Sequence, residues 1–369
     1  MDRYMKKILN IVIKTLLIFF ISIALFLIFD FLFGNFLISK YLYKIKDSNF
    51  YQKKFRIPHP VFHHTLAPYI SYTKMDWGNE QYYICTDQFG FKSKCENKNI
   101  TKFDLVFIGD SFTEGIGYKY EDTFVGIIDN KIKLSTANMG VTSYSPKIYL
   151  SKIKYYLENK IEFKHLVVFL DISDLDDDRN FYKLTKNFRI IDKRVDKRIE
   201  RFFRTNFYLT SQLKSIFFDR KTKIEKKAEN KKFLETIEFH RSSWTYSNSQ
   251  SNDLFYNNKE QAIDEILNTM FDLYKLLKEN NIKLSIAVYP WPDQILNDKV
   301  YSKQVILWEE FCKNKCANFI NYFPIFMSDS NNIGIKKNTI KKYYIQNDSH
   351  FNDEGHKLIA DYFIKNFKF

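Results

Sequence analysis

The chain begins with one long apolar stretch and continues with short apolar runs that alternate with amphipathic patterns. Short runs rich in β-branched and aromatic residues predict five strands, at 103–108, 134–139, 166–170, 284–289 and 319–322. Patterns with helical spacing predict helices at 122–130, 147–159, 261–279, 304–314 and 354–367. Continuous apolar strands that alternate with helices indicate a parallel sheet covered on both faces. The sequence therefore predicts an α/β domain whose ligands bind at the carboxyl ends of the strands.

The first apolar stretch, residues 8–38, is interrupted mainly by Lys14, Asp30 and Asn35. It is long enough for a membrane-spanning helix, which needs ~20 residues. A cleaved signal peptide is the alternative, but its apolar region is only ~7–15 residues long, and no small-x-small cleavage site follows here. We therefore expect an uncleaved single-pass anchor at 1–39, an anchor-proximal linker at 40–84 and the α/β domain at 85–369.

The side of the membrane on which the domain lies is predicted from two kinds of residue. More lysines follow the apolar stretch than precede it, which argues against export, although long domains translocate largely regardless of such charges. Cysteines argue for export, because Cys85 and Cys95 lie ten residues apart and Cys312 and Cys316 lie four apart. Two local pairs suit disulfides in an oxidising compartment. Four buried thiols are the alternative.

The net charge is concentrated in one part of the chain. Of the formal +14, residues 179–232 contribute +12, because they hold 18 Lys or Arg against six Asp or Glu. Residues 179–257 fit no strand-helix unit, so we interpret them as an insertion after the third strand, with parts forming basic amphipathic helices. Anionic lipid headgroups, an anionic glycan and nucleic acid are the possible partners, and a solvated insertion is the simplest alternative. Nucleic acid is least favoured, because no recognised binding motif accompanies the charge.

Glycine marks a candidate site. Five of the ten glycines fall within 32 residues, at Gly109, Gly115, Gly117, Gly126 and Gly140. The segment GDSFTEG at 109–115 is neither a P-loop nor a dinucleotide-binding fingerprint. It places Ser111 at a strand-to-helix turn, where its amide can face a developing oxyanion. An ordinary turn or helix cap is the alternative.

A second motif supplies what a nucleophilic serine requires, namely a base and a carboxylate that orients it. The run NDSHFNDEGH at 347–356 places Asp348 two residues before His350, just ahead of the last predicted helix. His350 can act as the base and Asp348 as the orienting group. His356 competes for the role of base, but its position inside the predicted helix favours a structural role.

Four segments together resemble the SGNH, or GDSL-type, hydrolase superfamily: GDSFTEG, ANMGVTSYSP at 137–146, VVFLDISDLDDD at 167–178 and DSHFNDEGH at 348–356. The resemblance covers roughly residues 85–175 and 282–367, and it extends to membrane-anchored bacterial proteins of polysaccharide O-acetylation or deacetylation. It implies a flavodoxin-like three-layer α/β/α fold. It also implies an anchor in the bacterial inner membrane with the domain on the periplasmic side.

The resemblance assigns roles to individual residues. Ser111 would be the nucleophile, His350 the base and Asp348 the orienting carboxylate, one position later than is usual in the family. The backbone amides of Ser111 and Gly140 would bind the oxyanion. Where the family has a third donor, an asparagine, this chain has Ser173. Two further carboxylates, Asp110 and Asp174, would support the site.

The implied function is a serine esterase or O-acyltransferase that acts through an acyl-Ser intermediate on O-acyl groups, chiefly O-acetyl, of a cell-surface glycan. No cofactor is implied, and a membrane acyl-donor protein is a possible partner. A lipid-directed esterase and a catalytically inert glycan-binding or assembly protein are the alternatives. The acidic run at 171–178 could bind a cation, but we expect it to cap the turn after the third strand. We interpret His59, His63 and His64 as loop residues rather than metal ligands.

Overall fold

The structure is a computed structural model. It describes residues 2–33, 55–77, 80–96, 100–193, 207, 209–210, 241–246, 259–327 and 332–368. The chain forms two compact units, one of residues 1–47 with 194–233 and one of residues 48–193 with 234–369. Most of the predicted basic insertion lies outside the described residues, so the prediction that it is helical stays a prediction.

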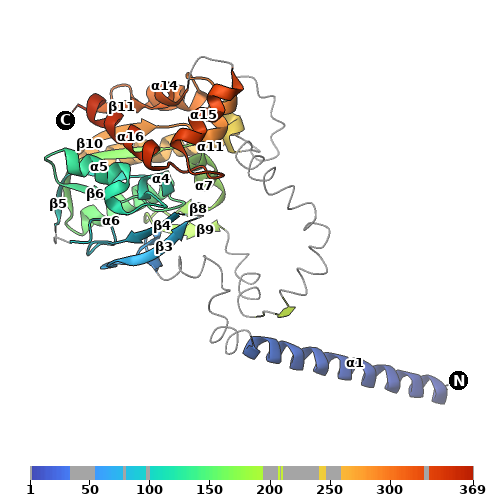
Figure 1. Ribbon diagram of the computed structural model, residues 1–369. Coiled ribbons are helices and arrows are strands. Elements are labelled where there is room, and N and C mark those ends of the chain that lie inside the picture. The colour runs from blue at the N-terminus through green and yellow to red at the C-terminus, as the bar shows by residue number, and fades with distance from the viewer. Residues whose placement is uncertain are drawn as a thin grey trace. The chain divides into compact units, whose positions relative to one another are not determined.

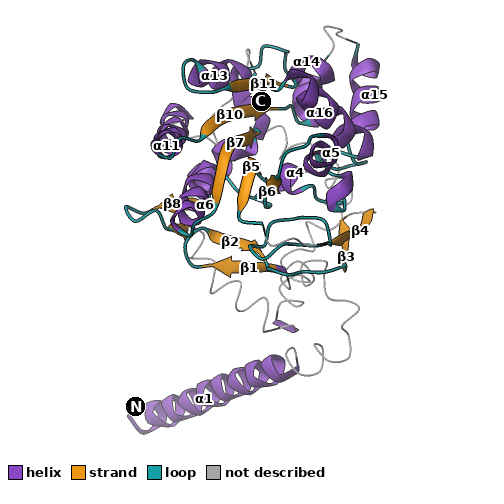
Figure 2. Ribbon diagram, turned by 90° about the vertical axis from the view of Figure 1, so that its left-hand side faces the viewer, coloured by secondary structure: helices purple, strands orange, loops and turns teal. Residues whose placement is uncertain are grey.

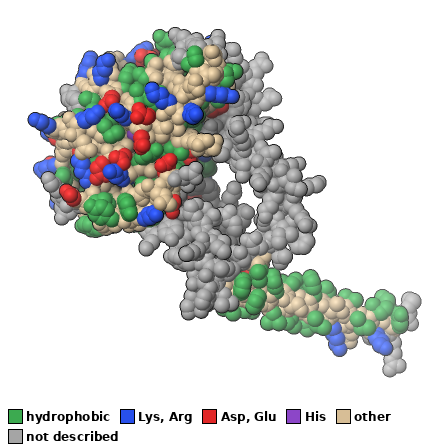
Figure 3. All heavy atoms as spheres, in the orientation of Figure 1, with side chains coloured by type: hydrophobic (Ala, Val, Ile, Leu, Met, Phe, Trp, Pro, Cys, Tyr) green, Lys and Arg blue, Asp and Glu red, His purple; other side chains and the backbone are tan. Residues whose placement is uncertain are grey.

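The first unit contains helix α1 (Asp2–Leu32), whose section Lys7–Leu32 is long and apolar enough to cross a membrane. Figure 3 shows hydrophobic side chains all along this helix. Near its end, the Asp30 carboxylate accepts hydrogen bonds from the backbone amides of Leu209 and Thr210, at 2.6 and 2.7 Å, and from the Thr210 hydroxyl at 2.6 Å. These donors satisfy a carboxylate whose burial without partners would be costly.

The second unit is built on a five-stranded sheet in the order β11-β10-β7-β5-β6, with every neighbouring pair parallel. The strands are β5 (Lys102–Ile108), β6 (Thr136–Asn138), β7 (Glu162–Leu170), β10 (Lys283–Val288) and β11 (Asn318–Asn321). This is the flavodoxin-like order, in which the chain reverses direction across the sheet between β5 and β7. The predicted fold class and all five predicted strands are confirmed.

Helices cover both faces of the sheet, as Figures 1 and 2 show. One face carries α5 (Phe124–Lys131) and α16 (Asp353–Asn366), and the other carries α6 (Pro146–Glu158), α11 (Lys259–Glu279) and α13 (Lys303–Cys312). These are the five predicted helices. Because both faces are covered, the residues at 166–170 of β7 are completely buried.

Shorter helices follow or link the strands. They are α4 (Ser111–Glu114), α7 (Ser173–Asn180), α12 (Pro292–Asn297), α14 (Phe323–Phe326) and α15 (Ile333–Tyr343), with 3₁₀ turns η2 (Tyr120–Asp122) and η4 (Ser243–Thr245). Helices α4 and α7 begin just after β5 and β7, at the carboxyl edge of the sheet.

The segment predicted as a linker belongs in large part to the folded unit. It forms two antiparallel hairpins, β1 (Arg56–His59) with β2 (His63–Leu66) and β3 (Thr73–Trp77) with β4 (Glu80–Ile84). Phe55, Phe62 and Leu66 are at most 2% exposed. The boundary at residue 85 therefore falls inside the unit, and His59, His63 and His64 lie in strands rather than in a loop. Short, largely polar strands such as RIPH carry no apolar run that would reveal them.

Part of the predicted insertion is also a hairpin, formed by β8 (Tyr182–Leu184) and β9 (Ile190–Asp192). The four cysteines form two local disulfides, Cys85 with Cys95 and Cys312 with Cys316. The first closes the loop after β4, and the second lies at the end of α13.

Candidate active site

Ser111 lies at a strand-to-helix turn, as its motif predicts. Strand β5 ends at Ile108, and Asp110 caps helix α4 by accepting a hydrogen bond from the Phe112 amide at 3.0 Å. A Cβ at Gly109 would lie 2.2 Å from the Thr113 hydroxyl, so only glycine fits this turn. The turn lies at the carboxyl end of β5, beside the point where the strand order reverses.

The structure brings the three predicted triad residues together. His350 Nε2 lies 2.8 Å from Ser111 Oγ. On the other side of the ring, His350 Nδ1 is hydrogen-bonded to Asp348 Oδ1, which also accepts the His350 backbone amide at 2.9 Å. Serine, histidine and aspartate thus form one hydrogen-bonded chain in the order that acyl transfer requires.

A tryptophan that the sequence did not reveal completes this chain. Trp77, at the end of β3, donates from Nε1 to Asp348 Oδ2 at 3.0 Å, and its ring meets the His350 ring edge-on at 5.3 Å. Burial alone would raise the pKa of Asp348, but the hydrogen bonds from His350 and Trp77 lower it below its usual value. Asp348 is therefore ionised at neutral pH.

His356, the competing base, lies elsewhere. It is buried in α16, and its Nδ1 accepts a hydrogen bond from the Phe124 amide at 3.2 Å. Burial lowers its pKa to about 3. His356 is a neutral residue of the core, as its position in a predicted helix indicated.

The three predicted oxyanion donors differ in whether they already donate to an acceptor within the protein. The Ser111 amide opens helix α4, where the first N–H groups have no intrahelical acceptor. The Gly140 amide donates to Asn138 Oδ1 at 3.0 Å, and both the amide and the hydroxyl of Ser173 donate to Asp171 Oδ1 at 2.7 Å. The geometry therefore directs the Ser173 hydroxyl to Asp171 rather than to a developing oxyanion, because the nearby carboxylate is the stronger acceptor.

A buried acidic cluster lies behind Ser111. Asp110 and Asp171 share the hydroxyl of Tyr289, which is 3.3 Å from an oxygen of each. Asp174 accepts the Asp171 amide at 2.8 Å and the Tyr149 hydroxyl at 2.7 Å. Burial, followed by the neighbouring acidic charges, raises the pKa of Asp110 and of Asp174 well above the usual value.

The acidic run after β7 therefore supports the turn, as expected. Asp178 continues the pattern by accepting hydrogen bonds from the Ser145 hydroxyl and the Lys147 amide, at 3.0 and 2.8 Å. Within the described part of the chain, no group of three or more His, Cys, Asp or Glu side chains is arranged to hold a metal ion.

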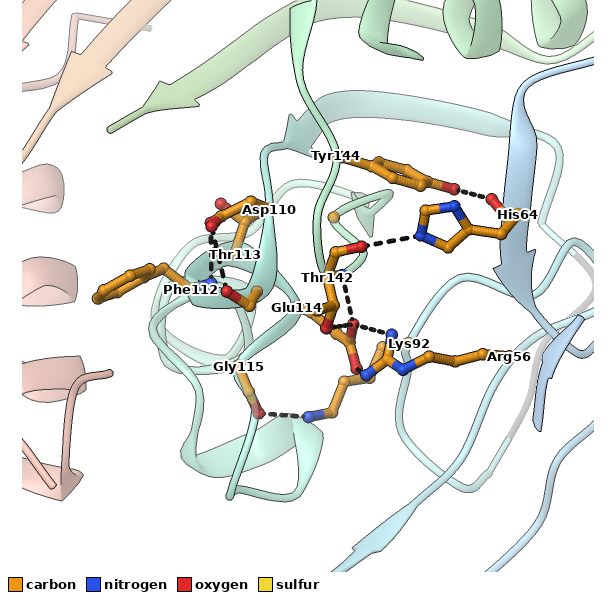
Figure 4. A network of polar contacts seen from close by, with 12 residues as sticks. Arg56, His64, Lys92, Asp110, Phe112, Thr113, Glu114, Gly115, Thr142 and Tyr144 are labelled. Atoms are coloured by element: carbon orange, nitrogen blue, oxygen red, sulfur yellow. Dashed lines mark hydrogen bonds and ion pairs between the residues drawn. The ribbon is translucent and has the colours of Figure 1, made fainter. Parts of the chain in front are cut away.

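A second network, drawn in Figure 4, fixes the back of the nucleophile helix. Glu114, the last residue of α4, is fully buried and forms a two-pronged ion pair with Arg56 of β1, with both contacts at 2.6 Å. The same carboxylate accepts the amide and the hydroxyl of Thr142, at 2.8 and 3.0 Å. The Thr142 carbonyl in turn contacts His64 Nε2 at 2.8 Å. Glu114 thereby ties the nucleophile helix to the loop that carries Gly140 and to the first hairpin.

The Arg56–Glu114 pair is stabilised in its charged form. Burial alone would lower the pKa of Arg56 and raise that of Glu114, but their mutual attraction reverses both shifts, so that the pKa of Arg56 is raised and that of Glu114 is lowered. Sequence reasoning missed this pair, because Glu114 was noticed only as part of a motif and Arg56 lies 58 residues earlier.

Fold and site together define an α/β protein with a flavodoxin-like sheet and a Ser-His-Asp chain at its carboxyl edge. No family model matches the chain, and no curated protein matches it. Among solved structures, it is similar to a member of the lipolytic protein G-D-S-L family from Veillonella parvula, at 12% identity and a TM-score of 0.38, over 72% of this chain and 97% of that one.

It is also similar to the psychrotrophic esterase EstA from Pseudoalteromonas, at 11% identity and a TM-score of 0.36, over 72% of this chain and 96% of that one. A third similar structure is the acetylxylan esterase Axe2 from Geobacillus stearothermophilus, at 10% identity and a TM-score of 0.35, over 71% and 93% of the two chains. Likeness of this degree assigns neither an activity nor a substrate.

Proposed function

We propose that this protein is a serine esterase or O-acyltransferase of the SGNH type, which removes or transfers O-acetyl groups of a cell-surface glycan through an acyl-Ser intermediate. The observation that carries the proposal is the hydrogen-bonded chain from Ser111 Oγ through His350 to Asp348. Such a chain positions a nucleophile, its base and the group that orients the base.

The reaction follows from the placement of these atoms. His350 Nε2 accepts the proton of Ser111 as Oγ bonds to the acyl carbon, and ionised Asp348 stabilises the resulting imidazolium. The free Ser111 amide donates to the oxygen on which negative charge develops. His350 then gives the proton to the departing group, which is a sugar oxygen in hydrolysis and belongs to the acyl donor in transfer. Water or a second sugar hydroxyl attacks the acyl-enzyme by the same steps in reverse order.

The substrate class and location are supported by features outside the triad. The four motifs resemble those of membrane-anchored glycan-modifying proteins. Helix α1 is long and apolar enough to cross a membrane, which would anchor the domain at the cell envelope. Two local disulfides suit the periplasmic side of the inner membrane. A membrane acyl-donor protein would supply the acetyl group if the reaction is a transfer.

The test is mass spectrometry of the full-length protein in detergent, incubated with an activated acetyl ester. One acetyl group on the peptide that contains Ser111 is expected in the parent protein and not in Ser111→Ala. A polysaccharide acceptor should shorten the life of the adduct if the reaction is a transfer. Comparing acetylated oligosaccharides with phospholipids as substrates separates a glycan esterase from a lipid-directed one.

A catalytically inert glycan-binding protein is the second candidate. One observation favours it, namely that the Gly140 amide and the Ser173 hydroxyl both have acceptors within the protein. If protein shown by circular dichroism to be folded neither becomes acetylated on Ser111 nor turns over any ester tested, this candidate replaces the esterase.

A further inference from the structure

The Ser111 hydroxyl has two neighbours but only one proton. Its oxygen lies 2.8 Å from His350 Nε2 and 3.1 Å from Asp110 Oδ2. Both distances are compatible with hydrogen bonds, so the second contact needs a proton from a source other than Ser111 if the first uses the serine proton.

The triad determines where the serine proton lies. Asp348 is ionised and accepts a hydrogen bond from Trp77, so His350 must supply the proton of the His350–Asp348 bond from Nδ1. A neutral imidazole that is protonated on Nδ1 has an acceptor at Nε2. In the state that is ready to react, Ser111 therefore donates its proton to His350. Ser111 Oγ then has no second proton to donate to Asp110.

The surroundings of Asp110 show which of its oxygens can hold a proton. Oδ1 accepts the Phe112 amide at 3.0 Å, a contact drawn in Figure 4, and it lies 3.3 Å from the Tyr289 hydroxyl. Only Oδ2 faces Ser111. A proton on Oδ2 would therefore complete a hydrogen bond to Ser111 without disturbing the contacts of Oδ1.

The neighbouring carboxylate, Asp171, receives more hydrogen-bond donors than Asp110. Its Oδ1 accepts the amide and hydroxyl of Ser173, and its Oδ2 accepts Trp291 Nε1 at 2.9 Å. Tyr289 has a single proton for its contacts with the two acids. Two buried carboxylates that share one site do not both ionise readily, and the one with more donors keeps the charge.

We propose that Asp110 is a neutral carboxylic acid whose Oδ2–H donates to Ser111 Oγ and so keeps the serine proton directed at His350. This inference rests on the proposed function, and Asp110 is a positioning residue in it. When His350 removes the serine proton and Oγ bonds to the acyl carbon, negative charge develops on the former carbonyl oxygen, and the hydrogen bond from Asp110 holds Oγ in the attacking position. Asp110 keeps its own proton throughout.

An ionised Asp110 would do the opposite. It would accept the serine proton itself and turn the hydroxyl away from His350. Burial opposes that state most, and the negative charges of Asp171 and Asp177 oppose it further, so the pKa of Asp110 is raised well above its usual value.

The test compares two substitutions that differ in one hydrogen bond. Asp110→Asn keeps an oxygen for the Phe112 amide and presents an N–H to Ser111, as the neutral acid does. Asp110→Ser keeps the helix cap but is too short to reach Ser111 Oγ. For full-length protein and an activated acetyl ester, we expect Asp110→Asn to retain the rate of Ser111 acylation within about threefold, and Asp110→Ser to lose ~10-fold to 100-fold.

Infrared spectroscopy provides a readout that a merely structural role would not change. The parent protein should show the absorption of a protonated carboxyl group at neutral pH, and Asp110→Asn should remove part of it. Asp174→Asn is the matched control, because Asp174 is a second buried acid with a raised pKa. Its hydrogen bonds are with Tyr149 and the Asp171 amide rather than with Ser111. The two difference spectra separate the two acids.

Two results would overturn the inference: an Asp110→Asn variant that is as slow as Asp110→Ser, or a spectrum of Asp110→Asn that retains all the protonated-carboxyl absorption of the parent. A parent protein that acetylates neither itself nor any acceptor would overturn the proposed function instead. In that case the infrared spectra still decide the protonation of Asp110.

Discussion

Two carboxylates contact the Ser111–His350 pair, Asp110 at the serine and Asp348 at the histidine, and the protein sets their charges differently. Asp348 has a side chain that is 24% exposed, and it receives hydrogen bonds from His350 and Trp77 that lower its pKa. Asp110 is 4% exposed, and burial, followed by the charge of the neighbouring Asp171, raises its pKa. The comparison shows that the number of donors facing a carboxylate, set against its burial and its acidic neighbours, decides whether it acts as an ion or as an acid.

The largest effect on the rate of acylation is expected from Ser111 and His350, the nucleophile and the base that Asp348 orients. Ser111→Ala and His350→Ala should each lower single-turnover acylation by ~10³-fold or more, because one removes the attacking atom and the other removes its proton acceptor. The double variant should be hardly slower than either single one, since the two groups act as a unit. Parent-like rates in both single variants would remove the enzyme proposal.

The next effect is on stability and concerns the Arg56–Glu114 ion pair, which ties the helix that carries Ser111 to the first hairpin. Arg56→Met and Glu114→Gln should each lower the free energy of unfolding by ~3–5 kcal/mol, because each leaves a buried charge without its partner. The double variant should lose less than the sum of the two. Urea denaturation of the three variants measures the coupling. Additive losses would mean that the ion pair contributes little and that Glu114 acts chiefly through Thr142.

A smaller effect is expected from the donor that distinguishes Asp348 from Asp110. Trp77→Phe keeps an aromatic ring beside His350 but removes the hydrogen bond to Asp348, which should cost ~10-fold in turnover. The lost donor stabilises the charged form, so the pKa of Asp348 should rise, and activity should be lost at a higher pH as the solution is acidified. A pH–rate profile of parent and variant tests this. An unchanged acid limb would show that Trp77 only packs against the ring.

The smallest effect on turnover is expected from Ser173, which donates to Asp171 in the acidic cluster behind Ser111. Because the Ser173 hydroxyl donates to Asp171, Ser173→Ala should lower turnover by less than about threefold, whereas the loss of an oxyanion donor costs ~10²–10³-fold. Steady-state kinetics with an activated acetyl ester distinguishes the two. A loss of tenfold or more would return Ser173 to the oxyanion role that the family resemblance implies.

The sequence predicted those parts of the site that lie in short local patterns. Asp110 and Ser111 are adjacent, and Asp348 lies two residues from His350, so each pair could be read from spacing. Trp77 could not, because its partner Asp348 is 271 residues away and its strand carries no motif. Long-range side-chain pairs depend on how elements pack, and no local pattern encodes that packing.

In the fold, too, the elements with a clear local pattern were predicted and the others were not. The central strands are continuous apolar runs, and all five were predicted, whereas the hairpins between residues 56 and 84 are short and largely polar and were taken for a linker. The contact between Ser173 and Asp171 escaped prediction for another reason. The two residues are only two positions apart, but which of several acceptors a hydroxyl chooses depends on distances that a sequence does not contain.

The location of Arg56 and Trp77 before residue 85 has a consequence for preparing this protein without its membrane helix. A truncated version that starts at residue 85, where the recognisable motifs begin, would lack the cation that neutralises Glu114 and the indole that holds Asp348. It would contain a buried, uncompensated acid at the end of the helix that carries Ser111. A version that starts at Phe55 keeps both side chains, and an inactive shorter fragment would therefore say nothing about the chemistry of the intact protein.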